Sequence, residues 1–265
     1  MTGPLRVERL GPVARVVLDR PEVRNAFNAD LIIALTDAFA TLADEPAEAL
    51  RAVVVAGDGP VFCAGADVEW LRAAGTMDLD ANEAEAGRLA TMLETIDTCP
   101  VPVVARVHGA ALGGGMGLCA VSDIVIAAAD ATFGFTETRL GILPAVIGPY
   151  AIAKIGEGQA RALFLPGRRF DAAQAEHIGL VHEVVADETA LDERVAATVE
   201  DLLAAGPHAA REAKALIRRL RGQPGPQARA LTIAAIARQR TSPEGQEGLT
   251  AFLEKRDPSW RARPD

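Results

Sequence analysis

The sequence has few aromatic residues and no long apolar run. Aromatic residues make up 4% of its 265 residues, so aliphatic side chains and alanine must fill any core. Hydrophobic residues nevertheless reach 49%, a fraction that supports a sizeable core and excludes a disordered chain. At about 150 residues per domain, this length predicts one large domain, or one domain with an appendage.

The lack of long apolar runs and the small numbers of cysteines and histidines exclude several classes of protein. No run approaches the ~18 apolar residues of a membrane span, and the first residues lack the pattern of a secretory signal. Cys63, Cys99 and Cys119 form an odd, widely spaced set that does not favour a disulfide framework. The four histidines lack the pairing of a metal site. We therefore expect a cytoplasmic protein that holds no metal and does not contact a membrane.

The charge balance is acidic. The chain has 27 basic residues against 36 acidic ones, a formal net charge of −9, and no basic stretch. Neutralising phosphates along a nucleic acid requires a basic field. The balance therefore predicts that nucleic acid is not a partner.

β-type runs alternate with helical patterns over the first two thirds of the chain. Apolar runs typical of buried strands occupy residues 13–18, 50–56, 101–107 and 124–127. Helical patterns occupy residues 28–42, with Asn28 as a plausible N-cap, and 81–97. From about residue 190 onward the pattern is almost entirely helical, with Gly-Pro breaks. The sequence thus predicts an α/β core over residues 1–190 and a helical region over residues 191–265.

Two glycine-flanked turns each follow a predicted strand and lead into a helical pattern. They span residues 61–68 and 108–118, and the second contains three consecutive glycines. Backbone N–H groups at a helix start can donate to an oxygen that becomes negative. Ordinary tight turns, or a helix packed closely on the sheet, are the alternatives. The Lys-Ser/Thr pair of a P-loop is absent, and so is a dinucleotide motif after the first strand. Together the turns favour two backbone donors forming an oxyanion hole for a thioester or another carbonyl.

Four segments resemble one known family. Residues 19–28, 62–67 and 109–115 look like the three signature segments of the crotonase (enoyl-CoA hydratase/isomerase) superfamily, and residues 247–256 resemble its final segment. The resemblance implies a spiral of ββα units with a helical C-terminal trimerisation region, and a homotrimer or homohexamer. It also implies an acyl-CoA thioester as substrate, with coenzyme A as part of the substrate and no separate cofactor.

The resemblance assigns the catalytic groups residue by residue. It places the oxyanion hole at the backbone N–H groups of Ala66 and Gly114, and the acid/base at Glu137. The hydratases of this family use two glutamates, and the position of the other glutamate is Gly117 here. This departure from the family pattern puts the ordinary two-glutamate mechanism in doubt.

The resemblance also predicts where coenzyme A binds. The pantetheine and adenine portions would lie along seven residues from three parts of the chain: Arg24, Ala26, Ala64, Asp67, Val68, Phe252 and Lys255. Phe252 and Lys255 would close over the adenine end, with a neighbouring subunit as one possible source. A solvated helix face is the alternative explanation for Lys255.

A single carboxylate beside an oxyanion hole allows more than one reaction. It can serve in two roles during hydration of a 2-enoyl-CoA, or it can shuttle a proton between carbons in an enoyl-CoA isomerase. A degenerate acyl-CoA-binding protein is a further alternative. Residues 137–150 resemble hydratases of branched glutaconyl-type esters, for which Arg139 is a candidate partner of a second substrate carboxylate. A surface or intersubunit salt bridge is the alternative for Arg139. The Tyr150 hydroxyl has two alternative interpretations: a polar group of the substrate pocket, or the solvent-exposed end of a ring that packs in the core.

Overall fold

The computed structural model describes residues 3–261 and contains two sheets. The large sheet has the order β1-β2-β3-β4-β6-β9, with β1 antiparallel to β2 and the remaining neighbours parallel. Its strands are β1 (Leu5–Leu10), β2 (Val13–Leu18), β3 (Ala52–Gly57), β4 (Val103–Val107), β6 (Ile124–Ala128) and β9 (Glu183–Val185). The four strands predicted from the sequence are all in this sheet, and the α/β class is confirmed.

The small sheet consists of three-residue strands. It has the order β5-β7-β8, formed by β5 (Ala110–Leu112), β7 (Thr132–Gly134) and β8 (Arg169–Asp171). Isolated bridges extend it, because Cys63 pairs with Ala111 and Phe27 pairs with Ala66. Segments this short carry too few residues for an alternating pattern, so the sequence did not predict them.

Helices fill the space between and around the sheets. Those of the core are α1 (Ala29–Ala43), α2 (Val68–Ala74), α3 (Leu79–Thr98), α4 (Gly114–Val121), α5 (Gly148–Phe164), α6 (Ala172–His177) and α7 (Glu188–Ala204). Short 3-10 helices lie at Pro21–Val23, Glu137–Leu140 and Ser259–Arg261. Asn28 is the N-cap of α1, as predicted, and its side chain accepts from the Leu31 N–H at 3.0 Å.

One structural unit repeats along the chain. A strand of the large sheet is followed by a segment of the small sheet and then by a helix. This order recurs from β2 through Phe27 to α1, from β3 through Cys63 to α2, and from β4 through β5 to α4. Successive units therefore bring the same junction, the end of a small-sheet segment and the start of a helix, to one place in the molecule. This is the spiral of ββα units that the family resemblance implied.

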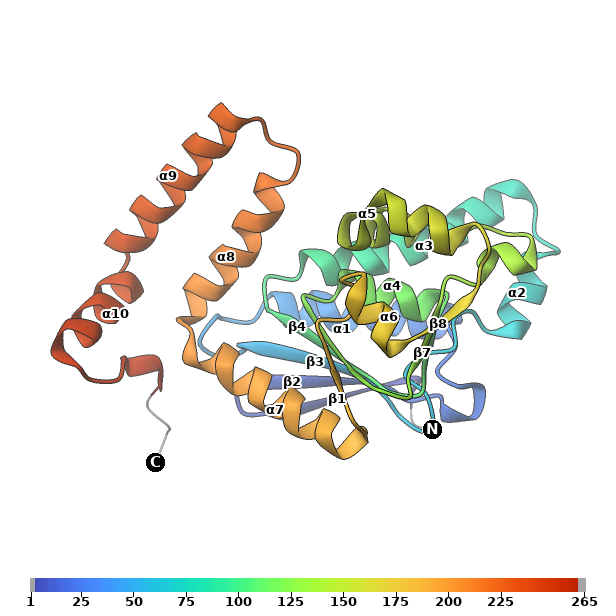
Figure 1. Ribbon diagram of the computed structural model, residues 1–265, viewed down its shortest axis with the longest axis horizontal. Coiled ribbons are helices and arrows are strands. Elements are labelled where there is room, and N and C mark those ends of the chain that lie inside the picture. Colours follow the sequence, from blue (N-terminus) through green and yellow to red (C-terminus); the bar gives the residue numbers. More distant parts are fainter. Residues whose placement is uncertain (1–2, 262–265) are drawn as a thin grey trace.

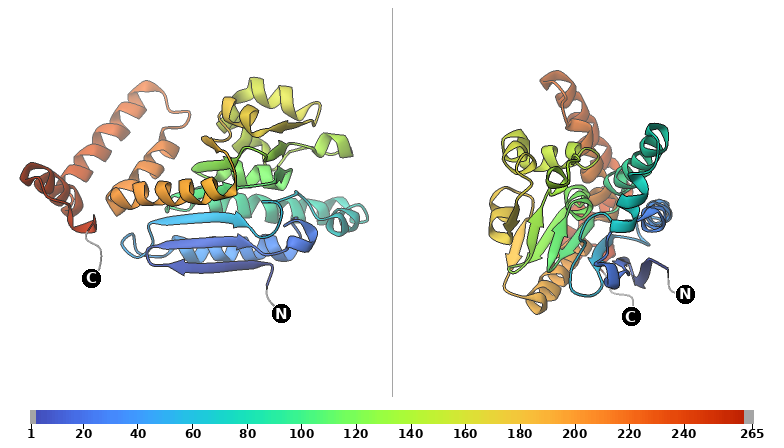
Figure 2. Two further views of the ribbon diagram at one scale, coloured as in Figure 1. Left: turned by 60° about the horizontal axis from the view of Figure 1, so that its bottom comes forward. Right: turned by 90° about the vertical axis from the view of Figure 1, so that its right-hand side faces the viewer.

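The large sheet is covered on both faces (Figures 1 and 2). One face and the helices α1, α3, α4 and α5 enclose the main core, which includes Phe27, Phe39 and Phe133. On the other face α7 lies along the strands and buries Leu191, Val195 and Val199 in a second cluster. Coverage of both faces explains why the parallel strands are rich in valine, isoleucine and alanine.

The C-terminal lobe stands away from this core. It comprises α8 (Pro207–Leu220), α9 (Gly225–Thr241) and α10 (Pro243–Glu254), at the left of Figure 1. The predicted boundary after residue 190 falls inside α7, and α7 packs on the large sheet. The lobe that projects from the core therefore begins near Gly206 rather than at residue 191.

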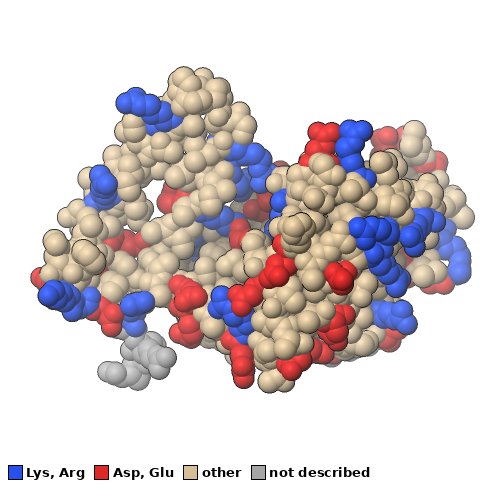
Figure 3. Space-filling view, viewed as in Figure 1, with Lys and Arg blue, Asp and Glu red and all other residues tan. Residues whose placement is uncertain are grey.

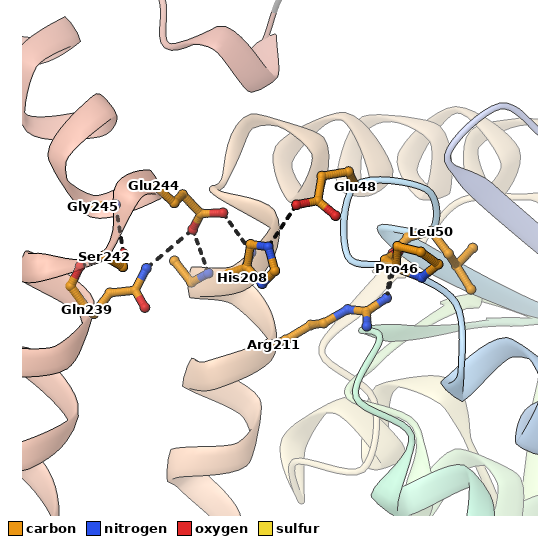
Figure 4. Close-up of polar contacts among 10 residues, drawn as sticks. Pro46, Glu48, Leu50, His208, Arg211, Gln239, Ser242, Glu244 and Gly245 are labelled. Carbon is orange, nitrogen blue, oxygen red and sulfur yellow. Dashed lines mark hydrogen bonds and ion pairs between the residues drawn. The ribbon is translucent and has the colours of Figure 1, made fainter.

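A polar cluster ties the start of the lobe to the core (Figure 4). The Glu244 carboxylate accepts from the His208 and Ala209 backbone N–H groups at 2.8 and 2.7 Å, so α10 caps the N-terminus of α8. The His208 ring contacts Glu48 at 2.8 Å, and Arg211 donates to the Leu50 carbonyl at 3.0 Å. The described part of the chain contains no helix long and apolar enough to cross a membrane.

Candidate active site

Two of the repeating junctions, those that lead into α2 and α4, meet at Gly113 beside the 3-10 helix that follows β7. A Cβ built on Gly113 would lie 3.5 Å from the Gly65 Cα and 3.5 Å from the Glu137 Oε1. Gly113 itself has φ of +47°, a backbone conformation that favours glycine. The loop before α2, the start of α4 and the 3-10 helix that begins at Glu137 thus converge, although their residues lie 48 and 24 positions apart along the chain.

The Ala66 N–H is directed away from its neighbouring segment. In the bridge between Phe27 and Ala66, the Phe27 N–H donates to the Gly65 carbonyl at 2.7 Å, and the Asp67 N–H donates to the Phe27 carbonyl at 2.9 Å. In a parallel bridge of this kind, the N–H of the middle residue points to the opposite side. Ala66 is therefore placed to donate to a ligand.

The Gly114 N–H is the first of α4 and has no intrahelical acceptor by position. A Cβ on Gly114 would lie 2.6 Å from the Phe27 ring, and one on Gly115 would lie 2.6 Å from the Cys63 carbonyl oxygen. The glycine run is thus explained by close packing as well as by the conformation of Gly113. Phe27 contacts both predicted donor segments, a role that the sequence did not reveal.

Buried side chains fix the loop that carries Ala66. The Asp67 carboxylate caps α2 through the Glu69 N–H at 2.9 Å and pairs with Arg20 at 2.9 Å. Burial opposes ionisation of Asp67, but the bonds from Arg20 and the Glu69 N–H prevail and lower its pKa. Asn25, fully buried, donates to the carbonyls of Asp58 and Val61 at 2.8 Å. Both Asp67 contacts are internal to the protein, so they position the loop.

Glu137 has the environment of an acid/base. Its Oε2 is buried and has no hydrogen-bond partner in the described residues. Burial raises the pKa of the Glu137 carboxyl, and a backbone hydrogen bond only partly opposes this. A carboxyl with a raised pKa and an unpartnered oxygen is suited to take up and return a proton.

The position of the missing second glutamate is closed. A Cβ on Gly117 would lie 2.7 Å from the Ile147 Cγ2 and 3.4 Å from the Leu93 Cδ2, and both of these residues are buried. An acidic side chain does not fit here unless Ile147 moves. The sequence showed the glycine but not the side chains that fill the space around it.

The predicted coenzyme A residues fall into two groups. Arg24, Ala26, Ala64 and Val68 lie on the two segments that flank Ala66, and the Arg24 carbonyl accepts from the Ala64 N–H at 3.0 Å. Arg24 and Val68 are exposed. Phe252 is 80% exposed on α10, and Lys255 is its C-cap, with φ of +55°. Because α10 and α2 lie at opposite ends of the molecule (Figure 1), these two residues are remote from the Ala66 segment of their own chain.

Arg139 and Tyr150 have other surroundings. The Arg139 side chain is exposed, and its Nε donates to the Pro166 carbonyl at 3.1 Å. Tyr150 lies on α5 and lines a cavity that faces α8. Among the described residues, no cluster of His, Cys, Asp or Glu could hold a metal ion.

The spiral of ββα units thus brings the segments of Ala66, Gly114 and Glu137 together, as the resemblance implied. The enoyl-CoA hydratase/isomerase family matches residues 8–263. The chain belongs to this family, the crotonase superfamily.

Relatives of known name cover nearly the whole chain. A putative enoyl-CoA hydratase from Thermus thermophilus is 33% identical over 97% of this chain and all of its own length. A crotonyl-CoA hydratase from Syntrophomonas wolfei is 35% identical, over 94% of this chain and 95% of the relative. Among solved structures, AtuE from Pseudomonas aeruginosa is 38% identical, with a TM-score of 0.94 over 98% of this chain and all of that chain.

Proposed function

We propose that this protein is an enoyl-CoA hydratase that adds water to a 2-enoyl-CoA thioester with one glutamate. The observation that carries this proposal is the convergence at Gly113 of the Ala66 and Gly114 backbone donors with the Glu137 carboxyl, whose Oε2 is buried and has no partner in the described residues. The relatives named enoyl-CoA and crotonyl-CoA hydratases support the reaction type.

The two N–H groups would hold the thioester oxygen as it gains negative charge. Loss of one such donor typically costs about 10²–10³ in rate. Glu137 would remove a proton from water as the oxygen adds to the β-carbon, and would return that proton to the α-carbon. Since Ile147 fills the space beside Gly117, no second acid would act from that position. A branched glutaconyl-type ester is the acyl group we propose to test first, with Arg139 as partner of its second carboxylate.

The second candidate is an enoyl-CoA isomerase, and the closed space at Gly117 favours it specifically. An isomerase requires only one carboxylate to move a proton between the α- and γ-carbons, and the structure provides one at the Gly113 convergence.

A substrate panel separates the two reactions. Purified protein is given a 2-enoyl-CoA, a 3-enoyl-CoA and 3-methylglutaconyl-CoA, and the absorbance of the conjugated thioester is followed. A hydratase removes this absorbance from the 2-enoyl ester and incorporates water. If absorbance instead appears from the 3-enoyl ester and the 2-enoyl ester is not hydrated, the protein is an isomerase. A selective loss on the dicarboxylic ester in Arg139→Ala supports the glutaconyl assignment, and equal losses on all esters refute it.

We also propose that the protein assembles as a trimer or a dimer of trimers through its C-terminal lobe. The lobe exposes apolar side chains that a monomer would leave in water: Ile217, Ile233, Ile236, Leu249, Phe252 and Leu253. The face of the lobe seen in Figure 3 is largely uncharged between scattered basic and acidic side chains. Assembly would also bring Phe252 and Lys255 to the coenzyme A site of another copy.

A further inference from the structure

The chain contains only three lysines, and two of them line one cavity. Lys154 on α5 and Lys214 on α8 face a space of about 510 Å³ between the core and the start of the C-terminal lobe. The cavity is separate from the Gly113 convergence, and the proposed reaction uses neither lysine.

Lys154 is held at the C-terminal end of α4. Its Nζ donates to the carbonyls of Cys119 and Ser122 at 2.9 and 2.6 Å. A neutral amine has two protons and one lone pair, so two carbonyl acceptors are satisfied without a third proton. Lys154 is also one of the residues that line the cavity.

The surroundings of Lys154 favour the neutral amine. Burial lowers its pKa to about 8, and weaker attraction from Cys119, Asp123 and Asp97 opposes this. The pKa of the nearby His182 is lowered, chiefly by burial and then by the charge of Lys154. The other charged or titratable groups on the lining are Tyr150 of α5, Lys214 and Arg218 of α8, and Arg221, the C-cap of α8. Lys214 differs, because its Nζ forms an ion pair with Asp123 at 2.6 Å.

We propose that Lys154 is a self-modification site that is acylated by acyl-CoA thioesters entering this cavity. The nitrogen lone pair attacks the thioester carbonyl carbon, the C–N bond forms and the C–S bond breaks. Coenzyme A leaves as the thiol and carries the proton that the nitrogen loses, so no other reactant is required. Val121, Ala153 and Ile217 line the cavity with apolar surface for the acyl chain, while Arg218 and Arg221 supply positive charge for the phosphates.

Acylation has a structural consequence at α4. The amide nitrogen of an acylated lysine has a single N–H, so at most one of the Cys119 and Ser122 carbonyls keeps its partner. Because α4 begins at Gly114, the modification alters the far end of the helix that carries a proposed oxyanion donor.

The test incubates the full-length protein with butanoyl-CoA at about pH 7.5, followed by peptide mass spectrometry of all lysines and the N-terminal amine. Butanoyl-CoA is saturated, so the result does not depend on hydration, and failure here leaves the proposed function untouched. A group of pKa about 8 is roughly 24% neutral at this pH, against about 0.1% for an ordinary lysine. Allowing for the weaker nucleophilicity of a less basic amine, we expect Lys154 to be labelled about ten-fold faster than the exposed Lys255.

Lys214 and Lys255 are internal controls, since one shares the cavity but is ion-paired and the other is in solvent. Lys154→Arg replaces the nucleophilic amine by a guanidinium, and it should abolish the fast labelling without changing that of Lys255. The labelling rate of Lys154 should level off above about pH 8 while that of Lys255 keeps rising. The proposal is overturned if Lys154 is labelled no faster than Lys255, or if the two lysines show the same pH dependence of labelling. Both outcomes are measured on the native protein, so they hold even if the arginine variant does not fold.

Discussion

At the scale of single residues, the proposed reaction depends mainly on Glu137. The family motifs predicted it as the acid/base, with Ala66 and Gly114 as the oxyanion donors, from the sequence alone. Its buried oxygen without a partner was not predictable, because that depends on how loops distant in sequence enclose it.

The raised pKa of Glu137 has a consequence for stability. Burial disfavours the charged form, so ionisation of Glu137 destabilises the folded state relative to the unfolded one. We expect Glu137→Gln to be more stable than the native protein above the folded-state pKa of Glu137. This difference should shrink as pH falls through that pKa and vanish near the ordinary value of 4.5. Denaturant unfolding of both proteins across pH measures it, and a difference independent of pH would contradict the burial argument.

The closed space at Gly117 yields a second prediction. Gly117→Glu forces a side chain against Ile147, and overpacking of this kind costs about 1–3 kcal/mol. We expect this variant to melt at a lower temperature and not to gain hydratase activity. Gly117→Glu combined with Ile147→Ala should recover part of the lost stability. Full stability of the single variant would show that the space is open. The sequence could not predict that the space beside Gly117 is closed, because Leu93 and Ile147 lie 24 and 30 positions from residue 117.

At the scale of elements, the repeated junction is what places the site. The strands of the large sheet were predictable because each is a buried apolar run. The small-sheet strands, three residues each, were not, and it is their pairing that brings the three loops together. The order of the family motifs thus predicted which residues form the candidate site. How these residues are brought together depends on the strand pairs of the small sheet, which the sequence did not predict.

Variants of Asp67 test whether its ion pair with Arg20 holds the loop before α2 in place. Asp67→Asn keeps a capping oxygen but removes the charge that pairs with Arg20, and Asp67→Ala removes both. We expect both to lower the rate of the reaction, and the alanine variant to lose about 1 kcal/mol more stability through the missing cap. Thermal melting and steady-state kinetics measure the two effects. Unchanged kinetics in both variants would contradict the positioning role.

At the scale of the whole molecule, we propose that the core carries the reaction and that the C-terminal lobe carries the assembly. The helical character of the C-terminal region was predictable from its pattern, but its beginning near Gly206 was not, since α7 has the same helical pattern and packs on the sheet. The overall negative charge disfavours general affinity for polyanions, so the proposed coenzyme A site would rely on a few placed cations and backbone donors.

The exposed apolar side chains of α10 predict self-association. Replacing Phe252 and Leu253 together by Asp should convert the assembly to a smaller species and weaken coenzyme A binding in parallel. Leu165→Asp is the matched control, because Leu165 is 75% exposed but lies on the core. Analytical ultracentrifugation gives the mass. A native protein that is a monomer, or a double variant of unchanged mass, would contradict assembly through the lobe.

The most direct test of the single-glutamate account is the rate at which Glu137→Gln hydrates crotonyl-CoA in ¹⁸O-labelled water, compared with the native protein. General acid–base catalysis typically contributes about 10²–10⁴ in rate. The account predicts that the native protein incorporates the label, and that the variant folds and binds the thioester but turns over at least about 100-fold more slowly. Near-normal turnover by a folded Glu137→Gln protein would contradict it.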